Sequence, residues 1–202
     1  MKPILFNTDM VRSILEGRKT VTRRVVKPQP PATAHIAKVR NDYGWSLWKD
    51  DPQKHYMKPP YQPGDILWVR ETFRVDYLSN IIGSGRVQYK DGTYMNIRFS
   101  PGRYDMMRRA HRKPGWRPNE NMPREAARIF LRVTGVRVER LDDMTTDDVF
   151  MEGVFPTSTF EHIRDRWHQV WNSTIKPKDR ITYGWEANPW VWVIDFQRIS
   201  KA

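Results

Sequence analysis

Four residues near the start of the chain have the types and the spacing to do chemistry together. In the stretch LEGRKTVTRR, residues 15–24, they are Gly17, Lys19, Thr22 and Arg24. A threonine hydroxyl can attack an acyl group once a base removes its proton, and a lysine amine that has lost its own proton can be that base. A guanidinium stays charged and can hold a substrate or a developing oxyanion. If the chain turns at Gly17, the stretch therefore predicts a pocket lined by an amine, a hydroxyl and a guanidinium.

The same stretch also fits a basic strand edge exposed to solvent, or a phosphate-binding segment, because threonine favours strands and cations protect strand edges. For catalysis, the pKa of Lys19 must fall from about 10.4 to about 7 or 8, which requires roughly 4 kcal/mol of differential interaction. The neighbouring arginines lower it, but an exposed charge contributes only about 1 kcal/mol at 4 Å. Burial of Lys19 must supply much of the rest.

The elements around this stretch must turn the chain sharply. Residues 8–16 have an apolar stripe typical of a helix, which Asn7 or Thr8 can cap and Gly17 can end in the left-handed conformation. Residues 20–26, TVTRRVV, have the β-branched content of a strand. Thr22 and Arg24 then share one face of that strand, while Arg18 and Arg23 are expected to face elsewhere, toward phosphate or solvent.

The rest of the chain alternates short strands with a few separate helices. Strands are predicted at residues 64–73, 127–141 and 188–199, a hairpin around Asp91-Gly92 at 86–99, and helices at 145–153, capped by Thr145 or Thr146, and 157–175. Residues 28–62 are polar and weakly patterned. This pattern predicts an α+β protein built on a small barrel or a strongly curved sheet.

The composition favours a polyanionic partner. The chain has 202 residues, with 35 Lys and Arg against 23 Asp and Glu, for a net charge of +12. Nucleic acid or a nucleotide fits best, although many basic proteins bind nothing specific. The densest basic run lies between residues 103 and 117, and its candidate phosphate-binding residues are Arg103, Arg108, Arg109, Arg112, Lys113 and Arg117.

Other chemistries lack their usual residues. The chain has no cysteine, its five histidines show no metal-ligand spacing, and neither GxGxxG nor GxxxxGK[ST] occurs, so we expect no metal and no cofactor. No apolar run approaches the ~20 residues of a membrane span, and the apolar segment at the N-terminus is too short for a signal peptide. We expect a cytoplasmic protein that does not bind membranes, and favour a monomer.

The nine tryptophans divide by their surroundings. The periodic faces that carry Trp167, Trp171, Trp190 and Trp192 predict core positions for these four. Three others lie in irregular polar segments and are expected to contact a ligand or a partner: Trp45, Trp48 and Trp116.

The spacing of Gly17, Lys19, Thr22 and Arg24 resembles the G-x-K-x-x-T-x-R signature of the ASCH domain family, a branch of the PUA-like superfamily. The segments GDILWVRETF, TTDDVFMEG and NPWVWVIDF are similar to its Gly-Asp strand, acidic short helix and closing strand, in the family's order. The resemblance covers about residues 1–30, 62–73 and 127–199, and implies a single domain over 1–202 with insertions at about 31–61 and 74–126. The long, Trp-rich form is similar to ASCH proteins of phages and prophages.

The resemblance implies a PUA-like β-barrel, with a few flanking helices, whose cleft binds RNA or modified nucleobases. One compact branch with a similar signature hydrolyses N4-acetylcytidine with a Lys, a Thr and a Glu, which carry over to Lys19, Thr22 and Glu152 in FMEG. Glu71 is the rival carboxylate, and Asp147 and Asp148 are weaker ones. The candidate substrate contacts are Arg24, Trp68, Arg70 and Glu71, although Arg70 is expected first of all to pair with Glu71.

An ion pair between Lys19 and Glu152 would raise the pKa of the lysine and lower that of the acid, opposite to what base and proton donor need. The end of a helix, where Glu152 falls, disfavours its anion by only about 0.3 to 1 kcal/mol. Alternatives to the amidohydrolase therefore stay open: a non-catalytic RNA- or DNA-binding protein, a metal-independent ribonuclease, or a phage accessory factor.

Overall fold

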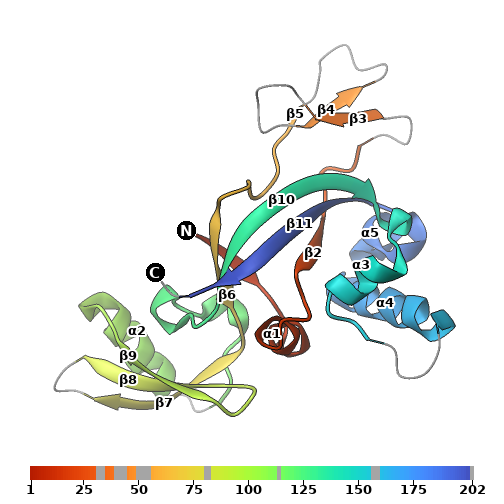
Figure 1. Ribbon diagram of the computed structural model, residues 1–202. Helices are drawn as coiled ribbons and strands as arrows, with labels where there is room; N and C mark the ends of the chain where they lie inside the picture. The colour runs from red at the N-terminus through yellow and green to blue at the C-terminus, as the bar shows by residue number, and fades with distance from the viewer. Residues whose placement is uncertain are drawn as a thin grey trace. The chain divides into compact units, whose positions relative to one another are not determined.

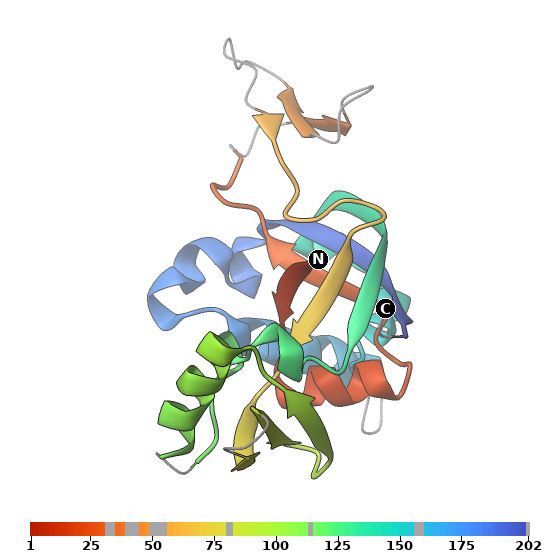
Figure 2. The ribbon, with the colours of Figure 1, turned by 90° about the vertical axis from the view of Figure 1, so that its left-hand side faces the viewer.

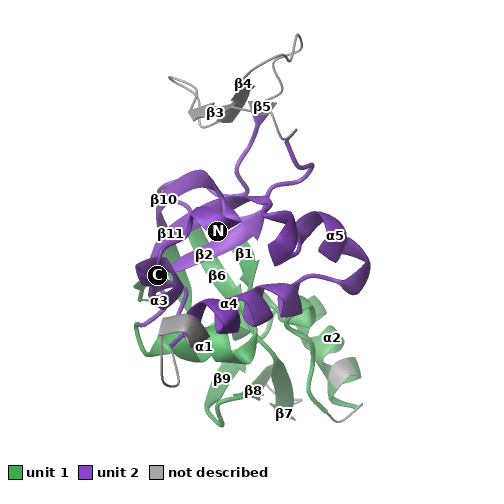
Figure 3. Cartoon of the chain, turned by 90° about the vertical axis from the view of Figure 1, so that its right-hand side faces the viewer, with its two compact units in different colours: residues 1–17, 66–132, 198–202 green, residues 18–65, 133–197 purple. Residues whose placement is uncertain are grey.

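The computed structural model describes residues 1–30, 35–38, 45–48, 56–79, 83–112, 115–155 and 160–200 of an α+β protein. The chain divides into two compact units (Figure 3). Unit 1 consists of Met1–Gly17, Ile66–Arg132 and Arg198–Ala202, and unit 2 of Arg18–Asp65 and Val133–Gln197. In the described part of the chain, no helix has the length and apolar character needed to cross a membrane.

Unit 1 begins with a strand and a capped helix. Strand β1 (Lys2–Leu5) pairs in parallel with β6 (Ile66–Arg70), and β6 pairs in antiparallel with the first residues of β10 (Phe130–Arg140). Helix α1 (Thr8–Leu15) starts where the Asn7 side chain accepts a hydrogen bond from the Met10 amide at 2.9 Å. It is followed by Gly17 at φ +75°, so the predicted helix, its cap and its left-handed end are confirmed.

A second sheet of unit 1 is a three-stranded antiparallel meander. It contains β7 (Phe73–Ser79), β8 (Ser84–Tyr89) and β9 (Tyr94–Arg98), and β8 and β9 form the predicted hairpin at Asp91-Gly92. Helix α2 (Pro101–His111) lies beside this sheet and packs Met107 against Phe73 and Val87 (Figure 2). This helix was not predicted, because it is mostly basic and has no apolar stripe. Short 3₁₀ turns follow at Asn119–Asn121 and Arg124–Ala126.

Unit 2 combines the rest of β10 with two further strands and the remaining helices. Strand β2 (Val21–Val25) pairs in antiparallel with β11 (Trp190–Ile199), which is also hydrogen-bonded to β10. Helices α3 (Thr146–Met151), α4 (Phe160–Thr174) and α5 (Arg180–Tyr183) gather at one end of these strands (Figure 1). Strands β3 (His35–Lys38), β4 (Trp45–Trp48) and β5 (Tyr56–Met57) form a small sheet, and 3₁₀ turns occur at Leu141–Asp143, Pro177–Asp179 and Trp185–Ala187.

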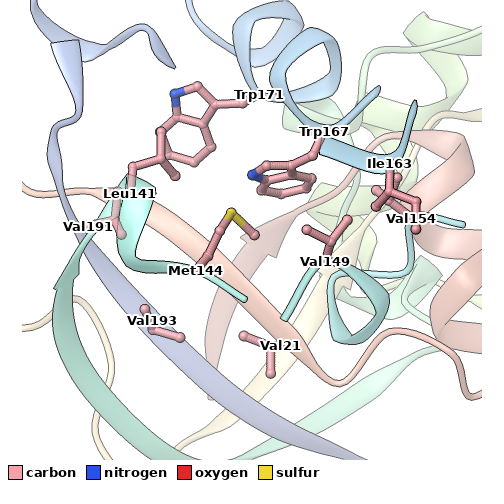
Figure 4. Packing of buried hydrophobic residues seen from close by; sticks show 10 residues of the cluster. All are labelled: Val21, Leu141, Met144, Val149, Val154, Ile163, Trp167, Trp171, Val191 and Val193. Atoms are coloured by element: carbon pink, nitrogen blue, oxygen red, sulfur yellow. The ribbon is translucent and has the colours of Figure 1, made fainter. Parts of the chain in front are cut away.

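The core of unit 2 forms around two tryptophans of α4. Trp167 and Trp171 are 2% and 4% exposed, their rings lie 6.3 Å apart, and they pack with Met144, Val149 and Val191 (Figure 4). Truncating a buried tryptophan to alanine typically costs about 3 to 5 kcal/mol, so this helix anchors the unit.

Of the two other tryptophans predicted to lie in the core, one is buried. Trp192 is buried as predicted, whereas Trp190 is half-buried with the Arg140 guanidinium 4.4 Å from its ring centre. Trp116 is 38% exposed, and the side chains of Trp45 and Trp48 lie outside the described residues.

The strand pairings of the described residues form open sheets within each unit and close no barrel there. Much of the predicted insertion at 31–61 lies outside the described residues, and the one at 74–126 lies in unit 1.

Candidate active site

Lys19 and Glu152 face each other across an isolated antiparallel β-bridge in unit 2. The neighbouring Thr20 amide donates to the Met151 carbonyl at 2.9 Å, which holds the chain before β2 against the end of α3. At the start of α3, the Thr145 hydroxyl accepts from the Asp148 amide, and the Asp148 carboxylate accepts from the Thr145 amide at 2.8 Å. This reciprocal cap, predicted in part from Thr145, fixes the helix that ends at Glu152.

The Lys19 ammonium is buried and fully hydrogen-bonded. The residue is 2% exposed, and its Nζ donates to the Val21 carbonyl at 2.7 Å, to the Glu152 carbonyl at 3.0 Å, and to Glu152 Oε2 in a direct ion pair. These acceptors match the three hydrogens that an ammonium carries. The pair is therefore held in one geometry, with both side chains out of water.

Burial lowers the pKa of Lys19 below its ordinary 10.5. The charge and hydrogen bond of Glu152 raise this pKa, whereas the charges of Arg24 and Arg23 lower it. The net direction is downward because removal from water disfavours the ammonium more than the glutamate favours it. The ion pair that would oppose a general base is thus present, but burial outweighs it.

Arg23 is buried, and the expectation that it faces solvent or phosphate is wrong. It is 3% exposed, and its guanidinium lies 3.0 Å from Asp148, 3.4 Å from Glu152 and 3.6 Å from Glu139. The cause is strand alternation, which places Arg23 on the same face as Val21, a residue of the core. Its Nε and Nη2 have no well-aligned hydrogen bond, so its contacts are mainly electrostatic.

Arg18 also does not simply extend into solvent. It is half-buried, donates from Nη1 to the Gly153 carbonyl at 3.3 Å, and lies 4.8 Å from the centre of the Phe155 ring. Both arginines thus bind the segment around Glu152.

Thr22 and Arg24 lie on the opposite face of β2 from Arg23. Thr22 is 1% exposed and pairs with Ile194 of β11. Among the described residues, no hydrogen bond joins the Thr22 hydroxyl to Lys19 or Glu152. Burial lowers the pKa of Arg24, while the charges of Glu152 and Tyr61 raise it.

Tyr61 is a site residue that sequence reasoning missed, because it stands in the weakly patterned segment before β6. Burial raises the pKa of its hydroxyl, and the charge of Arg24 lowers it. The charges of Tyr61 and Arg24 thus affect each other's pKa, which makes Tyr61 a candidate residue of the same site.

A wider acid and base network supports Arg23. Arg137 of β10 forms ion pairs with Glu139 and, at 2.6 Å, with Asp195 of β11, and lies 3.8 Å from Asp148. Gly135 permits this arrangement, because a Cβ at that position would lie 2.8 Å from an oxygen of Asp195. No local pattern in the sequence indicates Asp195 or Asp148 as partners of Arg137, since they come from β11 and α3.

Glu71, the rival carboxylate, is engaged within unit 1. It accepts from Arg128 Nε at 2.8 Å and Nη2 at 2.7 Å, and the expected pairing with Arg70 is wrong. Consecutive residues at the end of β6 point to opposite sides, so Arg70 instead donates to the Asn119 carbonyl at 3.1 Å and lies 5.5 Å from the Trp68 ring centre.

The basic residues predicted to bind phosphate lie mainly on α2 or just after it. Arg103, Arg108, Arg109 and Arg112 are exposed, and Arg103 lies 3.8 Å from Glu125. Arg117 forms a β-bridge with Phe73, and Lys113 lies outside the described residues.

Within the described ranges, no three or more His, Asp or Glu side chains cluster in a way that could hold a metal ion. No family model, curated protein or solved structure matches the chain. What the site can do must therefore be argued from its residues.

Proposed function

We propose that the chain is an ASCH-type, PUA-like protein that binds a nucleoside or RNA and hydrolyses the amide of N4-acylated cytidine at Lys19, Thr22 and Glu152. For N4-acetylcytidine the products are cytidine and acetate. The observation that carries the proposal is the buried Lys19, whose pKa is lowered although it contacts Glu152. A buried lysine whose pKa is lowered can activate a hydroxyl that comes within hydrogen-bonding reach.

The proposed reaction begins from the form in which Lys19 has released one proton to solvent, while Glu152 holds the free amine in place through their direct contact. The free amine then takes the proton of the Thr22 hydroxyl, and the threonine oxygen attacks the acyl carbon. Cleavage of the carbon–nitrogen bond releases cytidine, whose amino nitrogen takes that proton back from Lys19. Water then hydrolyses the acyl-threonine, which restores the hydroxyl.

Thr22 must approach Lys19 for this reaction, since the two are not hydrogen-bonded in the described structure. Catalytic hydrogen bonds often form only once the substrate is bound. Arg24 shares the strand face of Thr22 and is the group that stabilises the developing oxyanion.

The test is to incubate the purified full chain with N4-acetylcytidine and follow the formation of cytidine by liquid chromatography. Thr22→Ala is expected to abolish turnover, whereas Thr20→Ala, an exposed threonine two positions earlier, keeps it. Turnover that persists in Thr22→Ala would rule out the nucleophile assignment. A wild-type protein that is folded but inactive on this substrate would rule out the hydrolase.

A second candidate function is non-catalytic binding of RNA or DNA. It is favoured by the net charge of +12 and by the exposed arginines of α2, such as Arg108 and Arg109. Such binding weakens steeply as salt increases, with a slope set by the number of phosphates contacted. Binding with a flat salt dependence would contradict it.

A further inference from the structure

One face of the β7, β8 and β9 sheet is covered and the other is open to solvent. Met107 of α2 packs on the covered face with Phe73 and Val87. The strand register places the other side chains in two cross-strand rows, which together form what we call the open face: Arg74, Gln88 and Tyr94, then Tyr77, Arg86 and Asn96. Side chains in such rows point to the same side of a sheet.

Aromatic rings are unusually exposed on and beside the open face. Tyr77 is 56% exposed and Tyr94 is 50% exposed. Trp116, which is 38% exposed, lies beside β7, because the next residue along the chain, Arg117, pairs with Phe73 through its backbone. These are the exposed aromatic residues among the described residues of unit 1. Flat apolar rings in solvent are costly unless a partner covers them.

Cations lie against two of these rings, those of Trp116 and Tyr94. The Lys90 ammonium lies 4.1 Å and the Arg74 guanidinium 5.3 Å from the centre of the Trp116 ring, and Arg86 lies 5.0 Å from that of Tyr94. The acids nearby are already engaged, since Asp76 accepts from Arg86 at 2.7 Å and Asp91 lies 2.8 Å from Arg128. The open face is therefore positively charged.

The positive charge continues at strand β9, the edge of this sheet. Asn96 and Arg98 line a hollow of about 290 Å³ that also contacts Tyr77, and a second hollow of about 530 Å³. The second hollow is further lined by Arg103 and Arg124. A ligand that leaves the open face across β9 thus meets further arginines.

We propose that the open face binds a single-stranded nucleic acid, with bases stacked on Tyr77, Tyr94 and Trp116 and phosphates on the neighbouring cations. Every base presents a flat face to an aromatic ring, and phosphate contacts add affinity without sequence preference. A duplex hides those base faces, and an acidic peptide would use the cations but not the rings. The surface lies in unit 1 and does not depend on the proposed hydrolase.

The experiment measures fluorescence anisotropy of a labelled 12-nucleotide oligouridylate with the full-length protein. Tyr94→Ala and Trp116→Ala are each expected to weaken binding about tenfold. Tyr94→Phe and Trp116→Phe keep a ring and should bind nearly as the wild type does, which separates loss of stacking from loss of fold. The double variant Arg74→Gln, Lys90→Gln should flatten the log-log salt dependence by about 0.7 for each phosphate that the protein no longer neutralises.

The matched control is the double variant Lys176→Gln, Lys178→Gln, which removes the same charge from exposed positions of unit 2. It should change affinity by less than about threefold. The proposal is overturned if the Lys176, Lys178 variant loses as much affinity as the open-face variants, or if those variants bind as the wild type does. It is also overturned if a blunt duplex or poly-L-glutamate competes as well as the single strand.

Discussion

Unit 1 and unit 2 each bury a glutamate against a cation, and the two pairs differ in how the cation is held. In unit 1, Arg128 binds Glu71 with two well-aligned hydrogen bonds, lies 2.8 Å from Asp91, and lies 3.9 Å from the centre of the Tyr89 ring. In unit 2, the Lys19 ammonium forms an ion pair with Glu152, and both side chains are out of water.

The pKa values of these two cations are shifted in opposite directions. Burial lowers the pKa of Arg128, but the hydrogen bonds and charges of Glu71 and Asp91 outweigh it and the net pKa is raised. For Lys19, burial outweighs Glu152 and the pKa is lowered. A partly exposed cation that is bound by two carboxylates keeps its proton, whereas burial makes it easier for a fully buried ammonium such as that of Lys19 to lose its proton. The comparison singles out Lys19 as the reactive member.

Removing the acid of the unit 2 pair should have the largest effect on stability. Glu152→Gln leaves Lys19 and Arg23 buried without their shared carboxylate, and breaking a buried pair from one side costs about 3 to 5 kcal/mol. Urea unfolding of the wild type and the variant measures the difference. A loss below about 1 kcal/mol would mean that the pair is not buried in solution, and the contrast with unit 1 would disappear.

The pH dependence of turnover tests whether Lys19, unlike Arg128, loses its proton readily. Because the base is neutral Lys19 and its pKa is lowered, turnover should rise about tenfold per pH unit up to that pKa, which lies below 10.5. The charge of Arg23 lowers the pKa, so Arg23→Gln should move the midpoint to higher pH. A rate profile that is flat from pH 6 upward, or a midpoint that moves down, would contradict this assignment.

Lys19 should also make the stability of the protein depend on pH, in a direction that follows from its lowered pKa. Its folded pKa lies below its unfolded one, so the unfolded chain binds more protons and the free energy of unfolding rises with pH between the two values. Lys19→Met should remove that rise, as measured by urea unfolding between pH 7 and 10. An unchanged slope would indicate that Lys19 is solvated.

The matching change in unit 1 should be milder. Glu71→Gln keeps the shape of the side chain and leaves Arg128 paired with Asp91, so we expect a loss of about 1 to 3 kcal/mol in urea unfolding. Turnover of N4-acetylcytidine should be retained once the protein is folded. A stability loss greater than that of Glu152→Gln would reverse the ranking of the two pairs.

The smallest effect is expected at the start of α3. Thr145→Ala removes the cap that accepts from the Asp148 amide, and such a loss costs about 1 kcal/mol. The Thr146→Ala variant, one position further along, is the control and should lie within about 0.5 kcal/mol of the wild type. Equal losses in both variants would contradict the assignment of the cap.

Features that depend on neighbours in sequence were predictable. Asn7 and Gly17 mark the two ends of α1, Asp91-Gly92 turns the hairpin, and Thr145 caps α3, since each acts within a few residues. The signature spacing likewise indicated Lys19 as a reactive candidate, and it is buried against Glu152, the carboxylate that the resemblance placed first.

Features that depend on distant partners were not predictable. Arg23 has the sequence context of one more surface cation because Glu139 and Asp148, which compensate its charge, come from β10 and α3. Arg128 could not be recognised as the partner of Glu71 because 57 positions separate them. Helix α2 gives no periodic pattern, since Met107 alone of its described side chains is buried.

The backbone bridge between Lys19 and Glu152 has a consequence for how the protein is made. The two residues are 133 positions apart, and closing a flexible loop of that length costs about 4 kcal/mol of chain entropy. Until the ribosome has delivered Glu152 and the strands around it, Lys19 is an ordinary solvated lysine with no lowered pKa. A nascent or truncated chain that ends before this point therefore carries the whole signature without the buried lysine, so the proposed activity requires the assembled unit 2.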